Sequence, residues 1–329
     1  MFHISEFPIK TSYKDIPLEY RKTRTIVPAL YLFVCALLLI IIGPLAYFVD
    51  LAWFYVLCFV FSSILGDTLL KLQHEAMHGI LVANKQSNII LGKFISALVG
   101  TRYYDSRVIH MQHHTGLGEE NDPNLYWYDN QKNIFLFMIS QLLGAKLWMF
   151  LGRTVIVLMM LAAPAYAKTL KTGTSLDSSP VAENKGRGID DLIMLILVQS
   201  ILLVLIAYIS TFWIYMIYIL LPPSTLGSLI ESIRSFSEHV RNDDIPISNI
   251  AEKRRMFLVS SNMVEKIVMS QFGFQYHHLH HLYPTISVFN LEKLHIWMKE
   301  NVENYCETFV ERKSYTGTLI RYLLKKPLE

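Results

Sequence analysis

Residues 28–66 read PALYLFVCALLLIIIGPLAYFVDLAWFYVLCFVFSSILG and contain one charged side chain, Asp50. A helix rises about 1.5 Å per residue, so the uncharged run before Asp50 is long enough to cross about 30 Å of hydrocarbon. A second uncharged run, residues 51–66, follows it directly. The stretch predicts a helical hairpin across a membrane, whose second helix runs on beyond the hydrocarbon to His74.

A second uncharged region covers residues 192–230. At about 1.5 Å per residue it is too long for one span, so we expect two tightly joined spans. The turn is expected near residues 209–211, and Pro222 and Pro223 are expected to kink the second span.

The composition agrees with a membrane protein, because 52% of residues are hydrophobic and only 17% are charged, against about 25% in a soluble domain. The net charge of +3 does not indicate a nucleic-acid partner. Its three cysteines are scattered and form neither a disulfide framework nor a CxxC pair.

Residues 134–167 are apolar but interrupted by Lys146 and Arg153. We expect interfacial helices there, and a further pair of spans is the alternative. Lysine and arginine favour the cytoplasmic side, which predicts that both termini are cytoplasmic. The fold class is therefore an all-α polytopic membrane bundle of about four spans in two hairpins, with a cytoplasmic helical cap. We expect one domain over residues 1–329, divided into a cytoplasmic arm (1–25), a first hairpin (28–72), a segment with two histidine motifs (73–133), interfacial helices (134–167), a second hairpin (192–230) and a cap (231–329).

Twelve histidines occur, and ten of them form four short groups on the side predicted to be cytoplasmic. His3 and His295 lie outside these groups, and we expect no special role for them. The groups are an HxxxH motif at His74 and His78, an HxxHH motif at His110, His113 and His114, the run His277, His278, His280 and His281 with a second HxxHH spacing, and the single His239.

Residues three and four apart share one face of a helix, so each motif is expected to direct two or three imidazoles to one point. A histidine on a helix surface is usually only a solvated polar residue, and one such motif alone is weak evidence. Three motifs on one side of a membrane protein are stronger evidence, and imidazole suits iron, copper, zinc and nickel. Nine imidazoles are too many for one ion and suit two.

Two metal chemistries are less consistent with this set. Zinc sites usually close with four protein ligands, or with three and a water. The residues from His74 to His78 do match the bare HExxH pattern of metalloproteases, with Glu75 at the position of the glutamate. A protease would leave the other motifs unexplained.

With these motifs the sequence resembles the membrane fatty acid desaturase family over roughly residues 28–300. The resemblance rests on the order HxxxH, HxxHH, HxxHH, with the second hairpin between the last two motifs. It is strengthened by Asp122-Pro123 after the second motif, by Pro284 after the third, and by the single His239.

The resemblance implies a di-iron centre held almost wholly by histidines, with O2 as co-substrate. In animal acyl-CoA desaturases an asparagine four residues before the single histidine holds a metal-bound water, whereas Ser235 occupies that position here. The ligand role falls on His74, His78, His110, His113, His114, His239, His277, His280 and His281.

Metal-bound imidazoles usually donate their other N–H to a carboxylate or carbonyl. Asp67 lies seven residues before His74 on the same helical face and is a candidate for this role. Glu238 and Asp122 are weaker candidates. For His278, about 100° from the shared face, the alternatives are a substitute ligand, a group that supports a ligand, or a surface residue, and we favour the last two.

The activity implied is desaturation of a fatty acyl or similar lipid chain. The sequence has no HPGG haem segment, CxxCH, Rossmann glycine motif or iron–sulfur cysteine set, so an external b-type cytochrome or ferredoxin with its reductase is implied as electron donor. A carotenoid ketolase or hydroxylase, or another lipid hydroxylase, is the close alternative, and a non-catalytic membrane metal-binding protein is the alternative from another class. An endoplasmic reticulum and a bacterial inner membrane both fit.

Overall fold

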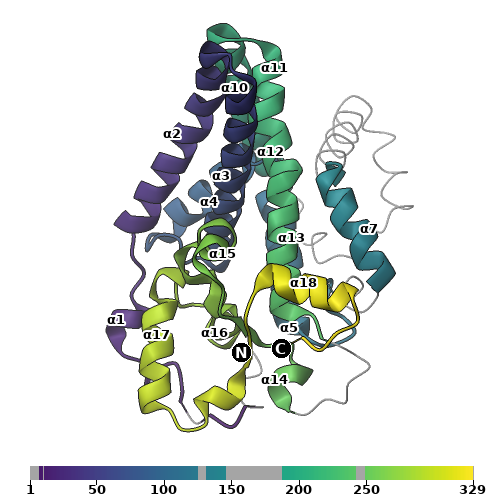
Figure 1. The fold of residues 1–329 in the computed structure, drawn as a ribbon. Helices are drawn as coiled ribbons and strands as arrows, with labels where there is room; N and C mark the ends of the chain where they lie inside the picture. Colours follow the sequence, from purple (N-terminus) through teal and green to yellow (C-terminus); the bar gives the residue numbers. More distant parts are fainter. Residues whose placement is uncertain (1–6, 10, 125–130, 146–186, 242–248, 329) are drawn as a thin grey trace, which may run out of the picture.

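The computed structural model describes residues 7–9, 11–124, 131–145, 187–241 and 249–328. In this part of the chain, four helical segments are long and apolar enough to cross a membrane. They stand side by side above a cap of shorter elements (Figure 1). The segments are α2 (Ile26–Val49), α3 (Ala52–His78), α10 (Arg187–Ile209) and the joined elements α11 (Phe212–Tyr215), η3 (Met216–Leu220), α12 (Leu221–Ser224) and α13 (Leu226–His239).

The first hairpin forms where the sequence predicts it. Its turn is set by Asp50, which has a left-handed φ of 50° and accepts a hydrogen bond from the Tyr55 hydroxyl at 3.0 Å. Helix α3 then continues to His78, as expected, and stops at Gly79. With a φ of 80°, Gly79 adopts the left-handed conformation that glycine enters without steric cost. The first histidine motif is thereby placed in the last turns of a membrane helix.

The second hairpin also turns at the expected position, between Ile209 and Phe212. Around Pro222 and Pro223 the helix is irregular at two points. A π-helical turn precedes the prolines, and Thr225 leaves helical geometry at φ −116° and ψ −95°. Proline lacks the amide hydrogen that a regular helix needs, so these irregularities replace the simple kink that the sequence predicts.

In the described residues between the two hairpins, the chain forms three helices. Helix α4 (Lys85–Leu98) packs against α3 and α10, and α5 (Tyr103–Gly116) carries the second histidine motif. Helix α7 (Gln131–Leu142) begins the region for which interfacial helices were expected, and its Ile134 and Met138 are buried against Phe236 of α13. Residues 146–167 of that region lie outside the described residues.

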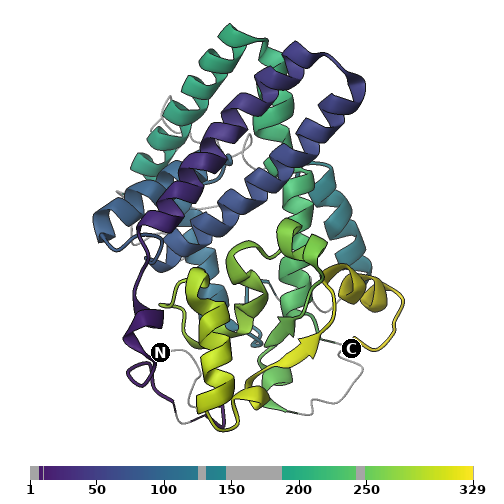
Figure 2. The same ribbon diagram turned by 60° about the vertical axis from the view of Figure 1, so that its left-hand side comes forward.

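The cap contains one feature that the sequence did not predict, a pair of three-residue parallel strands with Phe257 opposite Val310 (Figure 2). Strands this short give no readable alternation of polar and apolar residues. The other elements are helical, in agreement with the predicted fold class. The cap consists of α1 (Leu18–Arg21), α14 (Ile250–Lys253), β1 (Phe257–Val259), α15 (Met263–Val268), η4 (Gln271–Tyr276), α16 (His277–Leu282), α17 (Val288–Asn301), η5 (Tyr305–Thr308), β2 (Val310–Arg312) and α18 (Tyr315–Leu323).

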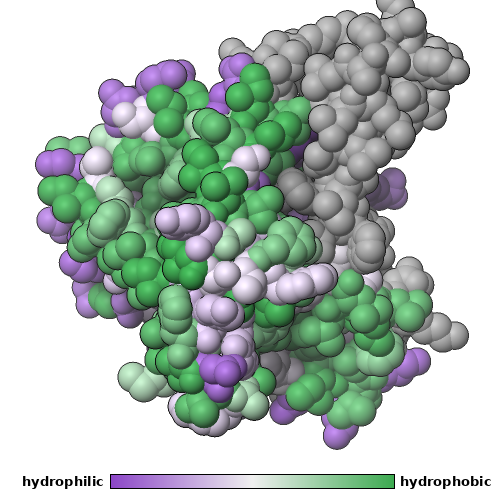
Figure 3. All heavy atoms as spheres, turned by 90° about the horizontal axis from the view of Figure 1, so that it is seen from above, coloured by the Kyte–Doolittle hydropathy of each residue, from purple (hydrophilic) through white to green (hydrophobic). Residues whose placement is uncertain are grey.

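Two large hydrophobic cores hold these layers together, one among the spans and one in the cap. The outer faces of the spans also carry large apolar side chains, among them Phe33, Tyr208 and Trp213, which are 63%, 90% and 68% exposed. Hydrophobic residues cover much of the described surface when the bundle is seen from its far end (Figure 3). Lipid contact accounts for so much exposed apolar surface, and the chain is an integral membrane protein.

Candidate metal centre

The histidine motifs meet where the spans join the cap. The end of α3 is fixed there by side chains that bind its last carbonyl groups, which have no partner within the helix. The Ala76 carbonyl accepts hydrogen bonds from the Asn88 amide and the Tyr103 hydroxyl, both at 2.8 Å. The Met77 carbonyl accepts one from Arg107 Nε, also at 2.8 Å. These contacts hold the first motif in place against α4 and α5.

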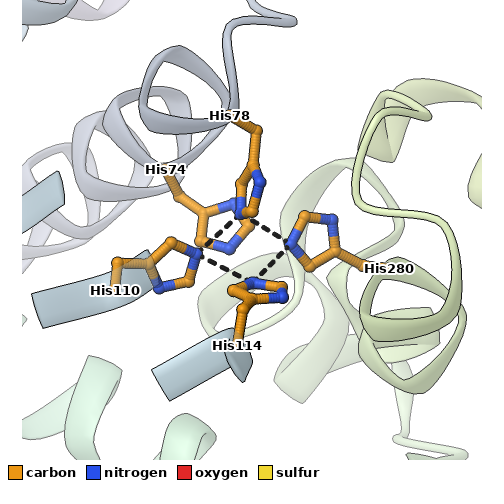
Figure 4. A group of neighbouring side chains, drawn as sticks. All are labelled: His74, His78, His110, His114 and His280. Atoms are coloured by element: carbon orange, nitrogen blue, oxygen red, sulfur yellow. Dashed lines mark hydrogen bonds between the residues drawn. The ribbon is translucent and has the colours of Figure 1, made fainter. Parts of the chain in front are cut away.

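Five histidines form the first group, with one nitrogen from each within 4.8 Å of all the others. Four of their Nε2 atoms make a closed ring of contacts (Figure 4). The separations are 2.7 Å from His78 to His110, 3.0 Å from His110 to His114, 3.2 Å from His114 to His280 and 3.0 Å from His280 to His78. His74 completes the group, and neither of its buried ring nitrogens has a hydrogen-bond partner among the described residues.

Hydrogen bonds alone do not satisfy this ring. A neutral imidazole nitrogen either carries a proton or offers a lone pair, and it does not do both. Each Nε2 of the ring faces two others but can make only one well-directed hydrogen bond, so at most two of the four contacts can be hydrogen bonds. A metal ion accepts all of the lone pairs at once, and the residues present therefore fit one.

The second group contains four histidines, again with one nitrogen each within 4.8 Å of the others. The Nε2 atoms of His277 and His281 are 3.0 Å apart. Two other members are oriented through their Nδ1 atoms. His113 Nδ1 contacts Asp122 Oδ1 at 2.9 Å, and His239 Nδ1 contacts the Arg255 carbonyl oxygen at 3.2 Å. Contacts of this kind fix the tautomer that leaves Nε2 free to bind a metal. The members are His113, His239, His277 and His281.

Burial also sets the charge of these rings. It lowers the pKa of five ligand candidates on α5 and α16 to well below the ordinary value of 6.5, and neighbouring histidines lower the pKa further. A neutral imidazole is the form that binds a metal. The histidines concerned are His110, His114, His277, His280 and His281.

All nine histidines that the sequence marked as ligands lie in these two groups. The expectation that each motif serves a single point is wrong for the second and third motifs, because both divide between the groups. His113 joins the second group while its neighbours His110 and His114 join the first. His280 joins the first group while His277 and His281 join the second.

Three acidic residues were expected to accept a hydrogen bond from a metal-binding imidazole, and their contacts differ. Asp122 contacts His113, as expected for that role. Glu238 Oε2 lies 4.0 Å from His277 Nε2, and its carboxylate also binds Arg234 and the Tyr315 hydroxyl. Asp67 is paired with Lys71, and among the described residues it contacts no histidine of either group.

His278 is not a surface residue, since its side chain is buried. Its Nε2 contacts the Tyr305 hydroxyl at 3.1 Å, and His295 Nδ1 contacts the same hydroxyl at 2.7 Å. His295 therefore has a structural contact that its isolated position in the sequence did not reveal. His3 lies outside the described residues.

The two carboxylate oxygens of Glu75 have different neighbours, and Oε1 lies 3.8 Å from His74 Nδ1. Its Oε2 accepts hydrogen bonds from the Ser287 hydroxyl at 2.7 Å and the Val288 amide at 3.0 Å, at the start of α17. The carboxylate therefore joins α3 to the cap. This contact explains the HExxH pattern without a protease.

The sequence analysis marked Asp67 and Glu238 singly but did not predict that they belong to a largely buried set of paired charges beside the centre. Lys71 lies between Asp67 and Glu231, and Arg234 lies between Glu231 and Glu238. The spacing of Asp67 with Lys71, and of Arg234 with Glu238, is four residues, the separation at which helical side chains pair. That spacing was a readable signal.

A cavity of about 380 Å³ opens beside the histidines, between α3, α5, α7, α10 and α13. Its volume is in the range of small-molecule sites. Apolar side chains supply much of the lining, among them Met77, Ile109, Phe137, Leu192 and Leu195. Histidines of both groups also face it, namely His74, His110, His113, His239 and His277.

The fold and the site together define a membrane-embedded helical protein with two adjacent histidine clusters that open on an apolar cavity. Comparison with protein families agrees, since the fatty acid desaturase family matches residues 68–313. The chain belongs to this family. A search of curated proteins found no match.

Proposed function

We propose that this protein is an O2-dependent di-iron desaturase that introduces a double bond into a fatty acyl or similar lipid chain. The observation that carries the proposal is the pair of buried histidine groups, which open on one largely apolar cavity in a chain of the desaturase family. Five imidazoles would hold one ion, and four would hold the other.

When bound, iron would activate O2 for attack on an unactivated C–H bond. The protein's own residues would fix and shield that site. Asp122 and the Arg255 carbonyl orient His113 and His239, and burial favours the neutral form of His281 by lowering its pKa. The apolar wall formed by Ile109, Leu192 and Leu195 would hold a hydrocarbon chain and exclude water.

We further propose that both termini and the metal centre lie on the cytoplasmic side, where basic residues of the cap are expected. Two electrons per turnover must then arrive from an external b-type cytochrome or ferredoxin with its reductase. The absence of haem, flavin and iron–sulfur motifs from the sequence supports this assignment.

The test is expression of the full chain in a host with a suitable electron donor, next to the His113→Ala variant, followed by mass spectrometry of lipids and pigments. We expect a lipid that has lost two hydrogens in the wild type alone. Gain of oxygen would replace the desaturase proposal with a hydroxylase or ketolase. An unchanged lipid profile with iron still bound, in the presence of a working electron donor, would favour a non-catalytic metal-binding protein.

A further inference from the structure

The cavity beside the histidines is not lined by hydrocarbon alone. Gln73, Ser232 and Ser235 also face it. Among the described residues, neither serine hydroxyl has a hydrogen-bond partner, and the Gln73 amide uses only its nitrogen, toward Ser96 and Thr101. A purely saturated chain would leave all three groups without a partner once it excluded water from the cavity.

Leaving such groups unpaired is costly. A polar group that is enclosed without a hydrogen bond loses its bonds to water and gains none in return. Ser232 is already 4% exposed, so a bound chain would remove its remaining access to water. The Ser232 and Ser235 hydroxyls and the Gln73 amide oxygen therefore disfavour a substrate that presents only methylene groups to this side of the cavity.

Their position relative to the metal centre follows from helix geometry. Ser232, Ser235 and His239 are spaced i, i+3 and i+7 on α13, which places them along one face of the helix. At about 1.5 Å per residue, the two hydroxyls lie roughly 6 and 10 Å from His239 along the helix axis. Gln73 directly precedes His74 on α3, which packs against α13.

We infer that the substrate carries a hydrogen-bonding group, such as a hydroxyl, amide or carbonyl, within about two helical turns of the carbon that is oxidised. Ser232, Ser235 and Gln73 are the residues that select it. This inference rests on the proposed function and narrows it to lipids oxidised near a polar group, as opposed to chains oxidised far from one.

The experiment uses two alkyl diazirine probes of equal length in lipid nanodiscs that contain the full-length, iron-loaded protein. One probe has a hydroxyl next to the diazirine carbon, and the other has only hydrogen there. After irradiation, peptide mapping measures labelling of the cavity residues. We expect the hydroxyl probe to label the cavity at least about fivefold more, the factor that one hydrogen bond supplies.

The combined variant Ser232→Ala/Ser235→Ala should remove this preference, and Gln73→Leu should reduce it. The matched control is Ser63→Ala, because Ser63 does not line the cavity and, within the described part of the chain, its hydroxyl bonds only the Phe59 carbonyl of its own helix, at 2.9 Å. Iron content and the thermal midpoint of each variant establish that it is folded.

Equal labelling by the two probes, labelling outside the cavity, or a preference that survives in the combined variant would overturn the inference. Photolabelling requires neither O2 nor an electron donor. If lipids are unchanged in the expression experiment but the probe preference is present, the proposed function fails and the polar subsite stands. If a double bond appears but the probes label equally, the proposed function stands and the polar subsite fails.

Discussion

Replacement of Asp122 by asparagine isolates one contact behind the second histidine group. The Asp122 carboxylate is fully buried, and its Oδ1 contacts His113 Nδ1 at 2.9 Å and the Asn124 amide nitrogen at 2.9 Å. Asparagine keeps the shape and an acceptor oxygen, so the imidazole retains its orientation. The substitution removes the negative charge that strengthens the hydrogen bond and makes the ring a better donor to a metal.

The magnitude follows from the type of bond. A hydrogen bond to a charged group contributes about 1.5–3 kcal/mol, and one between neutral groups about 0.5–1.5 kcal/mol. The difference is about 1–1.5 kcal/mol, and because both side chains are buried, solvent does not screen it. Since about 1.4 kcal/mol corresponds to a factor of ten, we expect Asp122→Asn to weaken iron binding about tenfold.

The assay is competition for ferrous iron between the purified full-length protein and a chromogenic chelator under anaerobic conditions. The control is Asp190→Asn, because the Asp190 side chain is 68% exposed and pairs only weakly with Lys93 at 3.7 Å. The control should bind iron like the wild type. If Asp122→Asn binds iron within a factor of about two of the wild type, Asp122 does not support a metal ligand and the reasoning fails.

Three further outcomes are expected. Gly227→Ala would place a methyl group 2.8 Å from the Ser63 carbonyl oxygen. This overpacking should lower the free energy of unfolding by about 1–3 kcal/mol, which is measured as a lower thermal midpoint. An unchanged midpoint would show that α3 and α13 separate easily. Tyr305→Phe should lower the free energy of unfolding by about 1–3 kcal/mol, because His278 and His295 lose the hydroxyl that both of them contact. The iron content should stay constant. The metal-free protein should be most stable above pH 6.5 and should lose stability as the pH falls below it. Burial lowers the pKa of His110, His114, His277, His280 and His281, so the unfolded chain binds more protons in that range. A thermal midpoint independent of pH would contradict their burial as neutral rings.

The hairpins and the histidine clusters could be predicted because their signals are local. Residues 28–66 are apolar over a length that only a membrane explains, and histidines recur at helical spacing at their end. The strand pair of Phe257 with Val310 could not be predicted, since it joins three-residue segments far apart in the chain. The contact between the Arg255 carbonyl and His239 could not be predicted either. Every residue type carries a backbone carbonyl, so the sequence does not indicate which one accepts a hydrogen bond.

The division of the motifs shows what the spacing does encode. Pairs four residues apart stay together, so His110 and His114 serve the first group and His277 and His281 serve the second. The third member of each motif crosses to the other group. At about 100° per residue, positions three and four residues beyond a ligand fall on opposite sides of it, about 60° one way and 40° the other. A helix that lies between two ions therefore reaches both with an HxxHH motif, whereas HxxxH reaches one. Since α5 and α16 each contribute to both groups, neither group can be assembled without the helices that build the other. Two ions bound there would be held at a fixed separation by the same two helices.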